Sequence, residues 1–132
     1  MRVLLLVPLL LLTACSAGGE DSLATAPPAN PLTVRYDPGE GGPVQTWLLD
    51  CAGGGDSDHP DAEAACAALD ALDDPFAPLP EHMVCTEQYG GPQEALVTGT
   101  WRGDEVDLQV SRRNGCEIAQ WDSLVPLLPA PS

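Results

Sequence analysis

Residues 96–111 read LVTGTWRGDEVDLQVS and contain the strongest secondary-structure signal in the chain. Apolar residues at 106, 108 and 110 alternate with polar ones, which is the period of a strand with one buried face. The Arg-Gly-Asp tripeptide at 102–104 separates two apolar arms and is typical of a tight turn. The stretch therefore predicts a β-hairpin with arms Leu96–Trp101 and Glu105–Ser111.

The rest of the chain supplies further elements of the same domain. Proline and glycine break up Phe76–Pro92, which predicts a long structured loop. The predicted strands and helices are Leu32–Tyr36 and Val44–Cys51 as strands, and Asp61–Leu72 and Cys116–Leu124 as helices. Strands that follow one another through turns, combined with helices, predict a small α+β domain with an antiparallel sheet.

The amino-terminal segment predicts export. The apolar run at 3–12 is too short to span a bilayer and suits a signal peptide, which we place at 1–14. Leu12-Thr13-Ala14-Cys15 resembles the bacterial lipobox, so Cys15 is the expected lipidation site, with an ordinary secretory signal as the alternative. Residues 15–31 are then a Pro-, Gly- and acid-rich tether, 32–129 the domain and 130–132 a tail. We expect a protein at the outer face of the cell membrane, or a secreted one.

The charge balance excludes one class of partner. The chain has no lysine, five arginines and twenty acidic residues, which give it a net charge of −15. Nucleic-acid binding requires cationic neutralisation of phosphates, so no nucleic-acid partner is expected. Contact with a membrane is expected only through the lipid anchor.

Four cysteines lie inside the predicted domain: Cys51, Cys66, Cys85 and Cys116. Four cysteines in an exported chain allow three disulfide connectivities, and their spacing does not choose among them. The spacings contain no C-x-x-C pair, so we expect no metal site and no cofactor.

Five blocks around these cysteines resemble the Streptomyces subtilisin inhibitor family. They are Cys51-Ala-Gly-Gly-Gly with His59-Pro60, Ala65-Cys66-Ala-Ala-Leu69, Val84-Cys85-Thr86 with Tyr89, Gly99-Thr-Trp-Arg-Gly103 and Arg113-Asn-Gly-Cys-Glu117. The resemblance runs from about Leu32 to Leu128. It implies sequential pairing of the cysteines, an antiparallel sheet of about five strands with two short helices, and a homodimer.

The same resemblance implies a reactive loop for serine proteases. It places the attacked bond two residues after the third cysteine, between Glu87 and Gln88. Cys85 and Thr86 precede this bond, Tyr89 follows Gln88, and Asn114 is implied to support the loop by hydrogen bonds. Gly90-Gly91 stands where the family has Asp-Pro, and we expect it to make the departing side of the bond more flexible.

Glu87 decides the expected partner. A carboxylate that enters an apolar pocket loses its hydration and costs several kcal/mol unless it is paired. The expected partner is therefore a serine endopeptidase, either subtilisin-like or specific for glutamate. The alternative is a non-inhibitory envelope lipoprotein that uses the same fold as an interaction module. The chain lacks the common catalytic motifs, so we expect no enzyme activity.

Overall fold

The computed structural model describes residues 31–52 and 56–131. These residues form four strands and two helices. In chain order they are β1 (Pro31–Asp37), β2 (Gln45–Asp50), α1 (Ala62–Asp70), β3 (Glu94–Trp101), β4 (Asp104–Ser111) and α2 (Gly115–Ser123). The predicted elements are therefore all present, with ends that differ by one or two residues, and the α+β class is confirmed.

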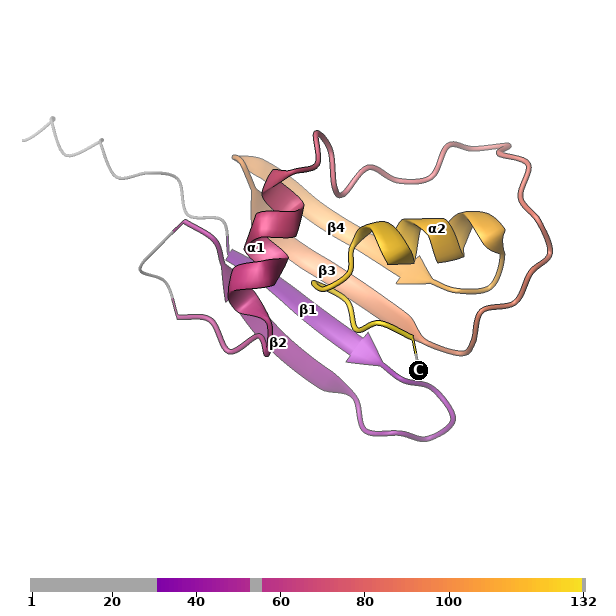
Figure 1. The fold of residues 1–132 in the computed structure, drawn as a ribbon, viewed down its shortest axis with the longest axis horizontal. Helices are drawn as coiled ribbons and strands as arrows, with labels where there is room; N and C mark the ends of the chain where they lie inside the picture. Colours follow the sequence, from indigo (N-terminus) through magenta and orange to yellow (C-terminus); the bar gives the residue numbers. More distant parts are fainter. Residues whose placement is uncertain (1–30, 53–55, 132) are drawn as a thin grey trace, which may run out of the picture.

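The four strands form one antiparallel sheet in the order β2-β1-β3-β4 (Figure 1). The amino end of β1 pairs with the carboxyl end of β2, since Pro31 lies opposite Asp50. The carboxyl end of β1 pairs with the start of β3, since Asp37 lies opposite Glu94. Glu94 in turn lies opposite Ser111, the last residue of β4. The sheet thus has two distinct ends, and the carboxyl end of β4 lies at the end opposite Pro31.

The expected count of about five strands is slightly too high for the described residues. The sequence pattern supports four strands, and the fifth came from the family resemblance alone. The segment between α1 and β3 contains no strand. Proline cannot donate to a strand ladder, and this segment carries Pro75, Pro78 and Pro80 within a few residues of one another.

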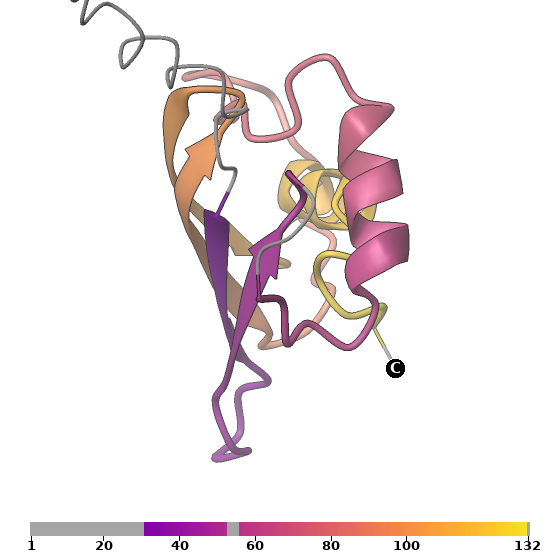
Figure 2. The same ribbon diagram turned by 90° about the vertical axis from the view of Figure 1, so that its left-hand side faces the viewer.

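Both helices pack on the same face of the sheet (Figure 2). They cover an apolar core whose largest fully buried side chains are Trp121, Leu32, Leu49, Leu69, Leu124, Leu127, Leu128, Val34, Val97 and Val110. The alternating apolar residues predicted for the second arm of the hairpin, Val106, Leu108 and Val110, are all buried on this face. Among the described residues, the helices and the carboxyl-terminal segment therefore cover one side of the sheet, and no helix covers the other.

The turn between β3 and β4 also fixes α1. Arg102 and Gly103 both have positive φ angles, of 50° and 85°, as a two-residue hairpin turn requires. The Arg102 guanidinium donates to the carbonyl oxygens of Asp70 and Leu72, at 3.2 and 3.3 Å. Asp70 is the last residue of α1 and Leu72 lies two residues beyond it, so these carbonyls are at the end of the helix, where backbone acceptors lack helical partners. The hairpin turn predicted from the sequence is thus confirmed and has a structural role.

His59 likewise holds the start of α1 to the core. Its Nδ1 accepts a hydrogen bond from the Asp61 N–H at 3.0 Å, and its Nε2 lies 2.8 Å from the carbonyl oxygen of Leu127. Because Nδ1 is an acceptor here, Nε2 carries the hydrogen that reaches Leu127. The side chain is buried and bonded at both ring nitrogens, as expected of a structural histidine.

Candidate functional site

The candidate site lies in the long connection between α1 and β3, which passes around α2 (Figure 1). Residues 85–90 of this connection lie against residues 112–116, which comprise the connection from β4 to α2 and the first two residues of α2. We call residues 85–90 the reactive segment and residues 112–116 its base. The base lies at the carboxyl end of β4, so the reactive segment lies at the end of the sheet opposite Pro31.

The amino side of the reactive segment is fixed by one covalent bond and one hydrogen bond. Cys85 is joined to Cys116 with a Cα–Cα distance of 5.3 Å, and Cys51 is joined to Cys66. The sequential pairing implied by the family resemblance is therefore confirmed. The Gly115 N–H donates to the Thr86 carbonyl oxygen at 3.0 Å. A side chain at position 115 would overlap the Thr86 hydroxyl, so glycine permits this close approach.

The carboxyl side is fixed at Gly90. Its N–H donates to the Arg112 carbonyl oxygen at 2.7 Å, and its carbonyl oxygen accepts from Arg112 Nε at 3.3 Å. A Cβ at position 90 would lie 2.7 Å from the nearest carbon of Ile118, closer than carbon atoms pack. The expectation that Gly90 adds flexibility is therefore wrong. Glycine here lets the main chain come close enough to be held at both of its polar groups.

The residues between the two fixed points are exposed. Glu87, Gln88 and Tyr89 all lie on the surface, and Tyr89 is 66% exposed. Among residues 31–52 and 56–131, no hydrogen bond or ion pair holds the Glu87 side chain. Val84, just before Cys85, is 95% exposed. The predicted reactive-loop residues are thus brought together in one short arch that is held at both ends and accessible between them.

Asn114 has a different contact from the one implied by the resemblance. Its side-chain oxygen accepts from the Glu117 N–H at 2.9 Å and caps the amino end of α2. The hydrogen bond to the reactive segment comes from its neighbour Gly115. Asn114 therefore orients the base, while direct support of the loop by its amide stays a prediction.

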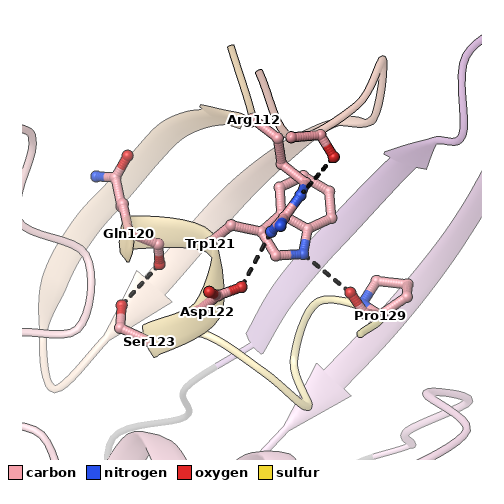
Figure 3. A network of polar contacts seen from close by, with 7 residues as sticks. Arg112, Gln120, Trp121, Asp122, Ser123 and Pro129 are labelled. Atoms are coloured by element: carbon pink, nitrogen blue, oxygen red, sulfur yellow. Dashed lines mark hydrogen bonds and ion pairs between the residues drawn. The ribbon is translucent and has the colours of Figure 1, made fainter. Parts of the chain in front are cut away.

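Arg112 is the residue of the site that the sequence interpretation missed. Its side chain is buried, and Nη1 donates to Asp122 Oδ1 at 3.0 Å. Its guanidinium lies over the Trp121 ring, 5.7 Å from the ring centre, and the Trp121 indole donates to the Pro129 carbonyl at 2.9 Å (Figure 3). Two adjacent arginines in a chain so poor in cations were the only sequence signal for this role.

Glu117 of α2 also holds the base in place. It accepts hydrogen bonds from the Ser111 hydroxyl at 2.6 Å and from the Arg113 N–H at 3.0 Å, and Arg113 Nε lies 3.5 Å away. Burial raises the pKa of Glu117, but these hydrogen bonds and the Arg113 charge lower it, so the net shift is downward. The carboxylate is thus held ionised as part of the base.

Two predicted features lie outside the described residues. They are the signal peptide at 1–14 and the lipidation site Cys15 with its tether up to residue 30, while Pro31, the last residue of the predicted tether, is the first residue of β1. Within the described part of the chain, no helix is long and apolar enough to cross a membrane.

Comparison with known proteins identifies relatives of this domain. A family model described as "Subtilisin inhibitor-like" matches residues 18–114. "Subtilisin inhibitor-like protein 3" of Streptomyces coelicolor is 35% identical over 95 residues, which cover 69% of this chain and 88% of the relative. A "Subtilase-type protease inhibitor" of Streptomyces coelicolor is 36% identical over 95 residues, which cover 69% of this chain and 65% of the relative.

A solved structure of Streptomyces caespitosus sermetstatin in complex with Bacillus licheniformis subtilisin is also similar. It is 24% identical, with a TM-score of 0.46, and the match covers 75% of this chain and 99% of that one. The sequence relatives are named as inhibitors, which confirms the prediction that the chain is not an enzyme. Because the family model matches well over half of the chain, the chain belongs to the subtilisin inhibitor-like family.

Proposed function

We propose that this protein inhibits a serine endopeptidase by presenting the Glu87–Gln88 bond as a substrate-like target. The observation that supports the proposal most directly is the arch itself, which exposes Glu87 between Thr86 and Gly90, both held to the base. A segment already ordered in its bound form loses little conformational entropy on binding, and this raises affinity. The names of the sequence relatives agree with inhibition.

The chemistry follows from the two fixed ends. The protease serine hydroxyl adds to the Glu87 carbonyl carbon, the bond from Glu87 to the Gln88 nitrogen breaks, and the proton of the hydroxyl passes to that nitrogen. The Gln88 amine stays beside the acyl ester because Gly90 remains bonded to Arg112. An amine held at high effective concentration attacks the ester again, reforms the peptide bond and returns the proton to the serine. Hydrolysis by one water is therefore slow in comparison with re-ligation.

The charge of Glu87 sets the proposed specificity. No hydrogen bond or ion pair within the described residues engages this side chain, so its carboxylate is available to a partner. Its transfer into an apolar pocket would cost several kcal/mol, and a cationic or hydrogen-bonding pocket would offset that cost. A glutamate-specific serine protease is the preferred partner, and a subtilisin-like protease would bind less tightly.

Export, lipidation and dimerisation belong to the same proposal. We place the protein at the outer face of the cell membrane, with lipid on Cys15, and the mass of the mature protein isolated from cells tests this. The face of the sheet away from the helices is the proposed dimer interface, because Leu48 of β2 is 40% exposed while its neighbour Leu49 is buried in the core, and Leu48 lies opposite Thr33 of β1. Leu48→Glu would then yield a monomer by sedimentation without unfolding the domain.

The test of inhibition uses the oxidised domain with a glutamate-specific serine protease, subtilisin and trypsin. Residual activity and peptide mass are followed together. The proposal predicts stoichiometric loss of the glutamate-specific activity and one slow cut after Glu87. Full activity of all three enzymes, with the loop intact or rapidly degraded, would instead favour the non-inhibitory interaction module.

A charge-reversal pair sharpens the assignment of the bond. Glu87→Lys should redirect inhibition to trypsin, while Glu81→Lys makes the same charge change at an exposed residue outside the arch. Trypsin that stays fully active at micromolar Glu87→Lys would show that the reactive bond lies elsewhere. Inhibition of trypsin by Glu81→Lys alone would lead to the same conclusion.

A further inference from the structure

We propose that Arg112 is a positioning residue that holds the departing side of the cleaved bond and so keeps the protein an inhibitor rather than a substrate. The inference rests on the proposed function and assigns a part of it to one side chain. Arg112 does not touch the Glu87–Gln88 bond. It acts through Gly90, two residues beyond Gln88.

The geometry singles out Arg112 because it engages both polar groups of one loop residue. Its own carbonyl oxygen accepts from the Gly90 N–H at 2.7 Å, and its Nε donates to the Gly90 carbonyl at 3.3 Å. The absence of a side chain at Gly90 brings this main chain against Ile118 and Arg112. The N–H and the C=O of Gly90 belong to the two peptide units on either side of its Cα, so both units are held. Gly90 is therefore a fixed point for the chain that begins at Gln88.

Arg112 is itself held by contacts that do not involve the reactive segment. Its Nη1 donates to Asp122, its guanidinium lies over Trp121, and the Trp121 indole is anchored to Pro129 (Figure 3). The Arg112 side chain is only 7% exposed, and Trp121 is 1% exposed. Through these contacts, α2 and the core restrain Gly90 and therefore the carboxyl side of the reactive segment.

With the contact between Arg112 and Gly90, the chain is held on both sides of the Glu87–Gln88 bond. On the acyl side, the disulfide and the Gly115 N–H hold Cys85 and Thr86. On the amine side, no disulfide is present in the described residues, and the Arg112–Gly90 contacts take its place. Once the bond is cut, the position of the new Gln88 amine depends on the Gly90 anchor. Loosening that anchor should lower the rate of re-ligation and leave acylation nearly unchanged.

The test compares Arg112→Gln with Arg35→Gln. Arg35 lies on β1, outside the reactive segment and its base, and its side chain is exposed, so this variant controls for the loss of one positive charge. Each variant is incubated with the protease that the wild type inhibits. One experiment starts from the intact variant and a second from the variant already cleaved after Glu87. The ratio of the two forms at equilibrium and the inhibition constant are measured, with the fold checked by tryptophan fluorescence.

We expect Arg112→Gln to inhibit about tenfold more weakly and to shift the ratio toward the cleaved form by a similar factor, as for the loss of one hydrogen bond to a charged group. Arg35→Gln should match the wild type in both measurements. Asp122→Asn, which keeps the arginine and removes its charged partner, should lie between them. If Arg112→Gln does not fold, Asp122→Asn replaces it in the test. Wild-type values for both Arg112→Gln and Asp122→Asn would overturn the proposal.

Amide hydrogen exchange separates this proposal from the proposed function. Without any protease, the Gly90 amide should exchange about tenfold faster in Arg112→Gln than in the wild type, because the side-chain contact that holds the adjoining peptide unit at the Gly90 carbonyl is lost and the segment opens more often. A wild-type protein that inhibits no protease but shows this change would refute the inhibitor function and retain Arg112 as the anchor of the loop. Unchanged exchange at Gly90 would refute the anchor itself.

Discussion

The two disulfides provide a matched test of how the reactive segment is restrained. Cysteine-to-alanine pairs remove either Cys85–Cys116, with a sequence separation of 31 residues, or Cys51–Cys66, with a separation of 15. The loop-entropy relation assigns about 3.7 kcal/mol to the first bridge and about 3.0 kcal/mol to the second. The two variants should therefore lose nearly the same free energy of unfolding.

Their effect on inhibition should differ because the bridges lie in different places. Cys85 is two residues before Glu87, so its bridge fixes the acyl side of the arch. Cys51 directly follows Asp50, which pairs with Pro31 at the other end of the sheet. Loss of Cys85–Cys116 leaves the single Gly115–Thr86 hydrogen bond to hold the acyl side. That variant should become a temporary inhibitor that is cut after Glu87 and then released.

The assay follows protease activity over hours at 10 °C, where both variants are expected to be folded, with urea unfolding to measure stability. Recovery of activity with a cut after Glu87 is expected only without Cys85–Cys116. The Cys51–Cys66 variant should inhibit like the wild type at the same temperature. Equal recovery with both variants would refute the reasoning, since it would mean that general stability, and not local restraint of the arch, controls cleavage.

Three further predictions concern single residues. The lowered pKa of Glu117 means that its contribution to stability is complete above the ordinary carboxylate pKa and is lost as the pH falls through the lowered value. Glu117→Gln should therefore destabilise the domain at pH 7, and its difference from the wild type should shrink as the pH falls through the lowered pKa, as measured by urea unfolding at several pH values. Gly90→Ala forces its new Cβ against Ile118 and should weaken inhibition and make the cleaved form accumulate faster, because re-ligation slows while acylation is unchanged, as measured by inhibition kinetics and peptide mass. Arg102→Ala removes the hydrogen bonds to the Asp70 and Leu72 carbonyls at the end of α1 and should cost about 1 kcal/mol in urea unfolding, with no change in inhibition.

The sheet and helices were predictable because their signals are local. Alternation at 106, 108 and 110 is set by neighbours two residues apart, and the buried face follows from it directly. The turn at Arg102-Gly103 needs two residues with positive φ, and the sequence supplies a glycine at one of them. The expected fifth strand is absent from the described residues. It was implied by the family resemblance, and no local period in this chain supports it.

The support of the reactive segment was not predictable in the same way, because it depends on residues that are distant in the sequence. Gly90 and Arg112 are 22 positions apart, and nothing periodic links them. A glycine beside a loop indicates flexibility when its partner is unknown. In the fold, the missing side chain permits a close approach and so produces restraint. A buried arginine in a connection between elements likewise has no sequence pattern of its own, and only the positions of Asp122 and Trp121 reveal its role.

The proposed lipid anchor and the proposed reactive bond lie toward opposite ends of the sheet. The described domain begins at Pro31, which pairs with Asp50 at one end of the sheet. The base of the reactive segment follows Ser111, which pairs with Glu94 at the other end. A strand advances about 3.3 Å per residue, so the seven residues of β1 separate these ends by roughly 20 Å. A lipid on Cys15 would therefore hold the domain by the end away from Glu87, and a protease could reach the arch without first contacting the membrane.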